Sequence, residues 1–506
     1  MTRTPNYSLH SLGAPGSHSL TVLQARPILR DKRFLSGGIV PDFDYDLAII
    51  GSGPAGHRAA IQAAKLRKRA IIIERNPIIG GVCVNTGTIP SKTMREAVLY
   101  LSGYREHAMY GASYRVKERI TLQDLLFRVD GVVRHEIDVS RHQLQRNGVE
   151  LACGAASFDD EHTLRVEFTD GSGRRKVKAA NILLAVGTHP AKDKAMPLDG
   201  VNIFTSDDIL QLSELPRTLT VIGAGVIGCE YASMFAQLDV QVTLIDSRPR
   251  LLPFVDHEIA DALAFHLREK RVTLRLGEKV ESVEPVESNG MTRVRVNLAS
   301  GKQIVTEKVL SSMGREGATG TLNLDAVGIK ADSRGRLEVN ENFQTPVPHI
   351  YAAGDVIGFP SLASTSSEQG RIAACHAFGV PAVHAPELLP YGIYTIPEIS
   401  FVGRNEEELT EQDIPYEIGK ARYDEIARGK IVGDSLGLLK LVFHRETHEL
   451  LGVHALGEGA CELVHIGQAV LSLGGKVDYF IKTVFNYPTL AECYKTAAFD
   501  GINRLA

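Results

Sequence analysis

Long apolar runs are missing from this sequence of 506 residues. No stretch approaches the roughly 18 apolar residues that a membrane-spanning helix needs, so we expect no membrane partner. The net charge is only −4, which predicts no nucleic-acid partner and no electrostatic membrane contact. The six cysteines are scattered, without the paired spacing of a metal site or the density of a secreted disulfide framework. We therefore expect no metal site and a reducing, cytoplasmic compartment.

The first 43 residues are poor in acids, since Asp31 and Asp42 are the only two. This stretch is rich in Ser, Gly, Pro and Arg and shows no sustained hydrophobic period, which favours a disordered N-terminal extension over residues 1–43. An organelle-targeting segment shares this composition and stays open as an alternative. The length of the remaining chain predicts about three domains.

A glycine-rich turn follows the apolar run that starts at Tyr45. Gly51 permits a tight turn, Gly53 lets the backbone approach a pyrophosphate, and Gly56 allows a helix to pack on the strand. The N-terminus of the Ala-rich helix that comes next would face the phosphates. Glu74 ends the second apolar run, where its carboxylate can accept hydrogen bonds from a ribose.

The same device recurs later in the chain. Gly223, Gly225 and Gly228 repeat the glycine spacing, and Asp246 stands as far beyond Gly223 as Glu74 stands beyond Gly51. One such pattern is weak evidence, but two copies with the acid in register predict that the chain binds two dinucleotides.

The segment from Ile79 to Met94 reads IGGVCVNTGTIPSKTM. It resembles the active-site segment of the flavoprotein disulfide reductases, in which two cysteines form a redox disulfide stacked on the flavin. Here Cys83 occupies the first cysteine position and Thr88 occupies the second. A threonine hydroxyl forms neither a disulfide nor a thiolate, so a dithiol relay is not available to this chain.

Further segments extend the resemblance from Asp44 to the C-terminus. Residues 182–188 are similar to the strand that closes the first half of the family's flavin domain. The resemblance implies FAD, NAD and NADP as cofactors, with FAD at the first glycine-rich turn and NAD or NADP at the second. The other positions expected to contact a nucleotide are Ala155, Gly314, Gly354, Asp355 and Ala363, with Asp355 bonding the ribityl chain.

The predicted fold class is α/β, with two Rossmann-like dinucleotide-binding domains and an α+β dimerisation domain. We expect the FAD-binding domain over residues 44–190 and 311–385, with the NAD(P)-binding domain inserted over residues 191–310. The dimerisation domain is expected over residues 386–506. The family resemblance implies a homodimer or a higher homo-oligomer.

Two charged residues match the family's flavin-side pair. Lys92 corresponds to the lysine that approaches flavin N5, and Glu230 corresponds to the glutamate that pairs with it. A buried ammonium without a partner is costly, so the pairing is physically reasonable. The alternatives are a solvated surface lysine and a carboxylate in the first turn of a helix, where the helix dipole favours it.

The family's general acid–base is also replaced. In the family, a His–Glu pair near the C-terminus protonates the leaving thiolate, whereas Tyr487 stands at the histidine position here. With an ordinary pKa near 10, a tyrosine is a poor general base at neutral pH. Because this group and the second cysteine are absent together, we predict that no thiol half-reaction takes place. Cys83 is then either a small buried residue, which we favour, or a peroxide-oxidisable thiol.

Because no disulfide can accept electrons from the flavin, the remaining electron acceptor is a second nicotinamide nucleotide. Asp246 suits a ribose 2′-OH, while Arg248, and with it Arg250, could neutralise a 2′-phosphate. The segments 87–92, 225–233 and 485–489 resemble those of the transhydrogenase members of the family.

We therefore expect ping-pong hydride transfer between NADPH/NADP⁺ and NADH/NAD⁺ through FAD. The alternatives are an NAD(P)H diaphorase or quinone reductase and a catalytically retired, redox-sensing binding protein.

Overall fold

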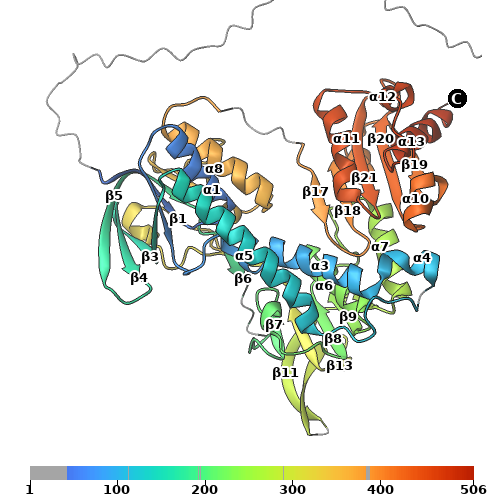
Figure 1. The fold of residues 1–506 in the computed structure, drawn as a ribbon, viewed down its shortest axis with the longest axis horizontal. Coiled ribbons are helices and arrows are strands. Elements are labelled where there is room, and N and C mark those ends of the chain that lie inside the picture. Colours follow the sequence, from blue (N-terminus) through green and yellow to red (C-terminus); the bar gives the residue numbers. More distant parts are fainter. Residues whose placement is uncertain are drawn as a thin grey trace, which may run out of the picture. The chain divides into compact units, whose positions relative to one another are not determined.

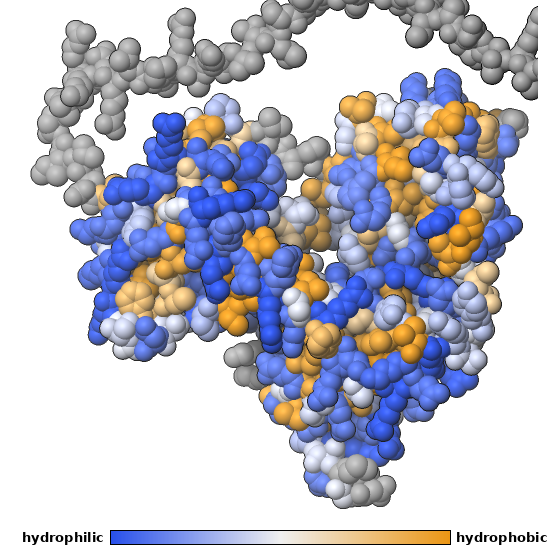
Figure 2. Space-filling view, in the orientation of Figure 1, coloured by the Kyte–Doolittle hydropathy of each residue, from blue (hydrophilic) through white to orange (hydrophobic). Residues whose placement is uncertain are grey.

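The computed structural model describes residues 43–111, 113–191, 193, 195–288, 290–382 and 388–505. The predicted extension over residues 1–43 lies outside these residues, apart from Phe43. Within the described part of the chain, no helix combines the length and apolar character needed to cross a membrane. Hydrophilic residues cover most of the face shown in Figure 2, and hydrophobic residues gather there in separate groups.

The first sheet is built around β1, whose Leu, Ala and Ile side chains are buried on both faces. Leu47 and Ile49 pack against helices, whereas Ala48 and Ile50 pack against further strands. Its parallel strands run in the order β3-β2-β1-β5-β16. The long strands β3 and β5 continue into an antiparallel sheet with β4. The strands are β1 (Tyr45–Ile50), β2 (Ala70–Glu74), β3 (Glu150–Asp160), β4 (Thr163–Phe168), β5 (Arg174–Leu184) and β16 (Ile350–Ala352).

Two helices from distant parts of the chain pack together beside this sheet. They are α1 (Pro54–Lys65) and α8 (Ala363–Ala377). A Cβ added at Gly370 would lie 2.1 Å from the carbonyl O of Ala55, so this approach requires a glycine. The other helices before β3 are α2 (Gly81–Asn85), α3 (Thr88–Ser102), α4 (His107–Tyr110) and α5 (Leu122–Arg146).

The second sheet is parallel throughout, with the order β10-β9-β8-β14-β7. An antiparallel sheet of β11, β12 and β13 accompanies it (Figure 1). The strands are β7 (Ile203–Thr205), β8 (Thr218–Ile222), β9 (Gln241–Asp246), β10 (Thr273–Leu276), β11 (Val280–Ser288), β12 (Met291–Leu298), β13 (Gln303–Thr306) and β14 (Lys308–Ser311). The helices are α6 (Val226–Gln237) and α7 (His257–Glu269). The short strands β6 (Thr188–Pro190) and β15 (Arg315–Gly317) pair with each other.

The C-terminal sheet is antiparallel, in the order β17-β18-β21-β20-β19, and is drawn in orange and red in Figure 1. α11 packs on β18 and β21, and α13 packs on β19 and β20. The strands are β17 (Tyr391–Ile393), β18 (Ile399–Gly403), β19 (Tyr416–Arg422), β20 (Leu438–His444) and β21 (Leu450–Leu456). The helices are α9 (Glu406–Glu411), α10 (Ala427–Val432), α11 (Ala460–Ser472), α12 (Asp478–Lys482) and α13 (Glu492–Asn503).

Candidate active site

The first glycine-rich turn joins β1 to α1. Gly51 has a φ of 106°, and a Cβ there would lie 2.2 Å from the carbonyl O of Ala185. A Cβ at Gly56 would lie 2.0 Å from the carbonyl O of Gly51, so turn and helix touch at this point. The missing Cβ of Gly53, in contrast, points into space that is empty for 4 Å. Its backbone is therefore open to a ligand beside the N-terminus of α1, where free N–H groups favour a phosphate.

Glu74 lies buried at the end of β2 beside this turn. Its carboxylate accepts hydrogen bonds from the backbone N–H and the hydroxyl of Ser52, at 2.9 and 2.7 Å, and from the N–H of Asn76 at 2.9 Å. These donors hold the carboxylate in place. Because each carboxylate oxygen accepts more than one hydrogen bond, ribose hydroxyls can still be accommodated.

The second glycine-rich turn repeats the geometry of the first. Gly223 has a φ of 104°, and a Cβ at Gly228 would lie 1.8 Å from the carbonyl O of Gly223. The missing Cβ of Gly225 again points into open space. The two turns therefore offer the same kind of exposed backbone at the start of a helix.

Asp246 is buried at the end of β9 and binds its own neighbour. The N–H of Ala224 donates to its carboxylate at 2.6 Å, and the Arg248 guanidinium donates twice, at 2.9 and 2.7 Å. Burial alone would raise the pKa of Asp246, but the hydrogen bonds from Arg248 and Ala224 lower it below its ordinary value. Arg250 pairs instead with the exposed Asp261, at 3.2 Å.

A cavity of about 1320 Å³ extends from the first glycine-rich turn to α6 and the C-terminal sheet. The predicted site residues that line it are Gly51, Gly53, Glu74, Cys83, Thr88, Lys92, Ala155, Glu230, Gly354, Asp355 and Ala363. The predicted site residues that do not line it are Gly56, Gly223, Gly225, Gly228, Asp246, Arg248, Gly314 and Tyr487. The cavity therefore brings together the flavin-side predictions and leaves the second glycine-rich turn outside.

Lys92 and Glu230 meet at this cavity from α3 and α6. The Lys92 ammonium donates to both carboxylate oxygens of Glu230 at 2.8 Å. The Glu230 side chain is buried, whereas the Lys92 side chain is 26% exposed. One side of the ammonium is therefore neutralised, and the charge remains available to the cavity.

Tyr394 is a site residue that the sequence did not identify. Its backbone N–H donates to Glu230 at 2.9 Å, and its ring lies 5.0 Å from the Lys92 ammonium. Its hydroxyl shares a hydrogen bond with Cys461, and burial raises its pKa. Tyr394 lies in the predicted dimerisation segment, and only the fold brings it to α3 and α6.

Arg315 is a second site residue that the sequence did not indicate. It donates to Thr188 at 2.9 Å and to Asp207 at 3.0 Å, and it lines the cavity. Burial raises the pKa of Asp355, while the Arg315 charge and a hydrogen bond from Ser366 counter this rise. A carboxylate held in this way suits a hydroxyl donor from a bound ligand.

Cys83 and Thr88 are neighbours in the structure. Burial raises the pKa of the Cys83 thiol, and a hydrogen bond with the Thr88 side chain only partly offsets the rise. All six cysteines are free. The thiol of Cys83 is therefore poorly suited to form a thiolate at neutral pH.

The two remaining predictions lie away from the cavity. Tyr487 is 74% exposed and lies in the segment between α12 and α13. Gly314 has a φ of 106° and accepts a hydrogen bond from the N–H of Ala191. The structure of one chain does not bring either residue to Lys92.

Residues 45–370 match the family described as pyridine nucleotide-disulphide oxidoreductase, and residues 389–498 match the dimerisation domain of that family. The chain therefore belongs to the pyridine nucleotide-disulphide oxidoreductase family. Among similar proteins, the soluble pyridine nucleotide transhydrogenase of Mycobacterium bovis (strain BCG / Pasteur 1173P2) is 53% identical, over 91% of this chain and 98% of the relative. The protein of that name from Pectobacterium atrosepticum is 45% identical, over 92% of this chain and 98% of the relative.

Solved structures agree with the fold. LpdA from Mycobacterium tuberculosis superposes with a TM-score of 0.82 at 27% identity, covering 91% of this chain and 99% of that one. The HOCl-induced flavoprotein disulfide reductase RclA from Escherichia coli gives a TM-score of 0.79 at 27% identity, covering 90% and 99%. The predicted fold class, with two Rossmann-like domains and a dimerisation domain, is confirmed.

Family membership implies FAD as the cofactor. The open backbone at Gly53, the fixed carboxylate of Glu74 and the buried carboxylate of Asp355 fit the phosphate, ribose and ribityl groups of this molecule. The residues present therefore fit FAD along the first glycine-rich turn and the cavity.

Proposed function

We propose that this chain transfers hydride between NADPH and NAD⁺ in a ping-pong reaction with one nicotinamide site. The observation that carries the proposal is the pairing of Cys83 with the Thr88 hydroxyl, next to a complete Lys92–Glu230 pair. A redox disulfide cannot form because Thr88 stands where a second thiol would be needed. The positive charge of Lys92 beside the cavity is nevertheless present. The transhydrogenase names of the relatives support the same reaction.

FAD, when bound, supplies the ring that accepts and returns hydride. The residues of the chain hold charge and position around it. Glu230 fixes the Lys92 ammonium, whose positive charge favours a negative charge developing in the cavity. NAD and NADP, predicted among the cofactors, enter this reaction as substrates.

Recognition of both nucleotides is assigned to the Asp246–Arg248 pair. Asp246 can accept hydrogen bonds from a ribose hydroxyl, and Arg248 can turn toward a 2′-phosphate because its side chain is 45% exposed. The pair neutralises itself when no phosphate is present. One site could thus take either nucleotide.

The test mixes purified holoenzyme with NADPH and a thio-analogue of NAD⁺ and follows reduction of the analogue. We expect turnover in the wild type and in Cys83→Ser, because no thiol takes part. Absence of exchange in a wild type with intact FAD would refute the proposal. Activity in the wild type that Cys83→Ser abolishes would point to thiol chemistry instead. Much faster turnover with a quinone or a dye would favour the diaphorase alternative.

We also propose that the chain forms a homodimer through residues 386–506, since the family match over residues 389–498 is to a dimerisation domain. Sedimentation equilibrium should give twice the chain mass of 55.1 kDa. A monomer at micromolar concentration would contradict this. We also propose that the protein is cytoplasmic, as expected from its scattered cysteines.

A further inference from the structure

A column of four stacked rings runs across three strands of the C-terminal sheet and along the cavity. The His454 ring stacks on Phe401 with centroids 6.0 Å apart, and Phe401 stacks on Tyr391 at 5.4 Å. Phe359 stacks on Tyr391 at 6.3 Å. His454 is buried, whereas Phe359 is 79% exposed, so the column runs from the protein interior to an open last ring.

The loop that carries the last ring is held in place. The Tyr391 hydroxyl donates to the carbonyl O of Pro360 at 2.9 Å, and the Ser361 hydroxyl donates to the carbonyl O of Gly358. Phe254 comes from the loop between β9 and α7, and its ring lies 5.8 Å from that of Tyr391. Phe359, Tyr391, Phe401 and Phe254 all line the cavity. The open ring is therefore a fixed surface at the same cavity as Lys92.

A phenylalanine held this far into solvent gains little from burial. Its face carries partial negative charge, so it attracts a flat ring that stacks on it and attracts a cation more strongly. An oxidised nicotinamide ring is both flat and positively charged, whereas the reduced ring is uncharged. The open face of Phe359 therefore suits the oxidised form.

The position of the cavity indicates which end of the dinucleotide reaches Phe359. Val226 and Glu230 of α6 line the cavity, whereas Asp246 and Arg248, which suit the adenosine ribose, do not. The adenine end would thus lie outside the cavity and the nicotinamide end inside it.

We infer that Phe359 forms a stacking subsite for the oxidised nicotinamide ring at the cavity, separate from the hydride-transfer position beside Lys92. This inference rests on the proposed function. With a single nicotinamide site, each oxidised nucleotide must leave before the next one reacts, and a ring stacked on Phe359 has left the flavin side while still bound.

Equilibrium titration of the oxidised holoenzyme with nicotinamide mononucleotide and, separately, with 5′-AMP tests the inference. Phe359→Leu keeps an apolar side chain but removes the ring, and Phe359→Tyr keeps the ring. The control is Phe265→Leu on α7, which removes another exposed phenylalanine that does not line the cavity.

We expect Phe359→Leu to weaken binding of nicotinamide mononucleotide about three- to tenfold, on the scale of one partly solvated cation–π contact. Phe359→Tyr and Phe265→Leu should bind like the wild type, and binding of 5′-AMP should not change in any variant. Unchanged binding of nicotinamide mononucleotide in Phe359→Leu, or a loss confined to 5′-AMP, would overturn the inference. Because this titration needs no turnover, its outcome is independent of the exchange assay.

Discussion

Two lysine–carboxylate pairs occupy different environments in this molecule. Lys92 is partly exposed and binds one carboxylate, that of Glu230. Lys440 on β20 is 1% exposed and binds Asp256, at 2.9 Å, together with Glu258 and Glu406. The first pair faces the cavity, and the second joins α7 to the C-terminal sheet.

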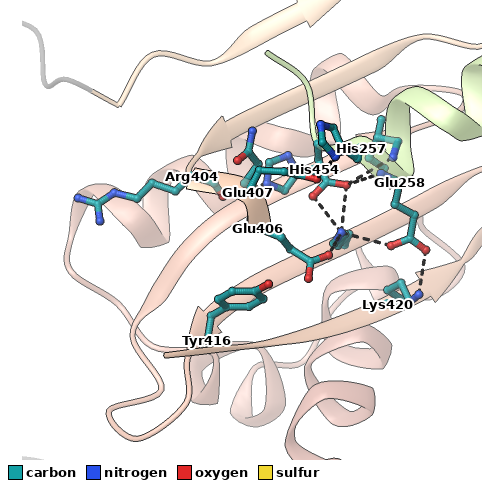
Figure 3. Close-up of polar contacts among 12 residues, drawn as sticks. His257, Glu258, Arg404, Glu406, Glu407, Tyr416, Lys420 and His454 are labelled. Carbon is teal, nitrogen blue, oxygen red and sulfur yellow. Dashed lines mark hydrogen bonds and ion pairs between the residues drawn. The ribbon is translucent and has the colours of Figure 1, made fainter. Parts of the chain in front are cut away.

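Figure 3 shows the polar contacts of the second cluster. Glu258 and Glu406 point toward a common ammonium, and Glu258 also binds Lys420 at 2.8 Å. Burial alone would lower the pKa of Lys440, but the carboxylates of Asp256 and Glu406 raise it. Burial alone would raise the pKa of Asp256, but the charges of His454 and Lys440 lower it.

The difference shows what partial burial does for a charge. A lysine surrounded by carboxylates holds two parts of the fold together and has no interaction left for a ligand. A lysine that pairs with one carboxylate and stays partly exposed can still attract negative charge in the cavity. We therefore expect substitutions at Lys440 to change stability and substitutions at Lys92 to change rate.

The largest expected effect is that of Lys440→Met. It leaves the fully buried Asp256 carboxylate without its cation, which should lower the free energy of unfolding by about 3–5 kcal/mol. Denaturant titration measures this loss. Lys420→Met is the control, since its partly exposed pair should cost at most about 1 kcal/mol. Equal small losses in both variants would show that burial does not distinguish the two lysines.

Lys92→Met should slow reduction of the flavin by NADPH by about 10²–10³-fold, because it removes a preorganised charge. Stopped-flow absorbance of the flavin band measures the rate. The double variant Lys92→Met/Glu230→Gln is the matched control, because it also removes the charge that Lys92→Met leaves unpaired. The double variant should regain the free energy of unfolding that Lys92→Met loses, but flavin reduction should stay slow. A double variant that reduces flavin at the wild-type rate would remove Lys92 from the mechanism.

A third pair, Asp246–Arg248, extends the comparison to an exposed cation. Arg248→Ala should weaken kcat/KM for NADPH by about 1–3 kcal/mol, the scale of hydrogen bonds to charged groups, and leave NADH nearly unchanged. Arg250→Ala is the control, since Arg250 pairs with the exposed Asp261. An equal loss for both nucleotides in Arg248→Ala would mean that the arginine supports the loop and does not select the phosphate.

The smallest expected effect is a pH dependence on α7. Burial, aided by the charge of Lys270, lowers the pKa of His266 to about 4, against about 6.5 in the unfolded chain. The unfolded state therefore binds the proton first, and stability should fall by about 1–2 kcal/mol between pH 6.5 and 5. Denaturant titrations across this range should show the fall in the wild type and a flatter profile in His266→Gln.

The Lys440 cluster should respond in a different pH window. The folded-state pKa values of Asp256 and Glu258 are lowered, so their contribution is present above the unfolded value of about 4 and is lost only at lower pH. The buried His454 and the partly buried His57, whose pKa values are also lowered, add to the fall below pH 6.5 that remains in His266→Gln. Identical profiles in the wild type and in His266→Gln would contradict the role given to His266.

The sequence predicted those features that depend on short spacings. The two glycine-rich turns, with their acids at equal distances, indicated two Rossmann-like domains, and the fold class is confirmed. Lys92 and Glu230 were paired from the family resemblance, and the structure places them 2.8 Å apart. Their roles in catalysis stay predictions.

Contacts between distant segments could not be read in the same way. Tyr394 meets Glu230 across 164 residues, and Arg315 meets Thr188 across 127. Patterns of residues close together in the sequence do not indicate such contacts, because they form only when whole sheets fold together. The sequence also did not predict the pairing of Arg248 with Asp246, because two side chains in one loop can point toward each other or toward a ligand.

Glu230 has one further consequence. This carboxylate sits on α6 beside the second sheet, yet it accepts from Lys92 of the flavin-side helix α3 and from the backbone of Tyr394 next to the C-terminal sheet. A swing of the second sheet by more than about an ångström would stretch both bonds beyond hydrogen-bonding range. Any motion of the second sheet during nucleotide exchange must therefore either pivot near this carboxylate or break its bonds to Lys92 and Tyr394.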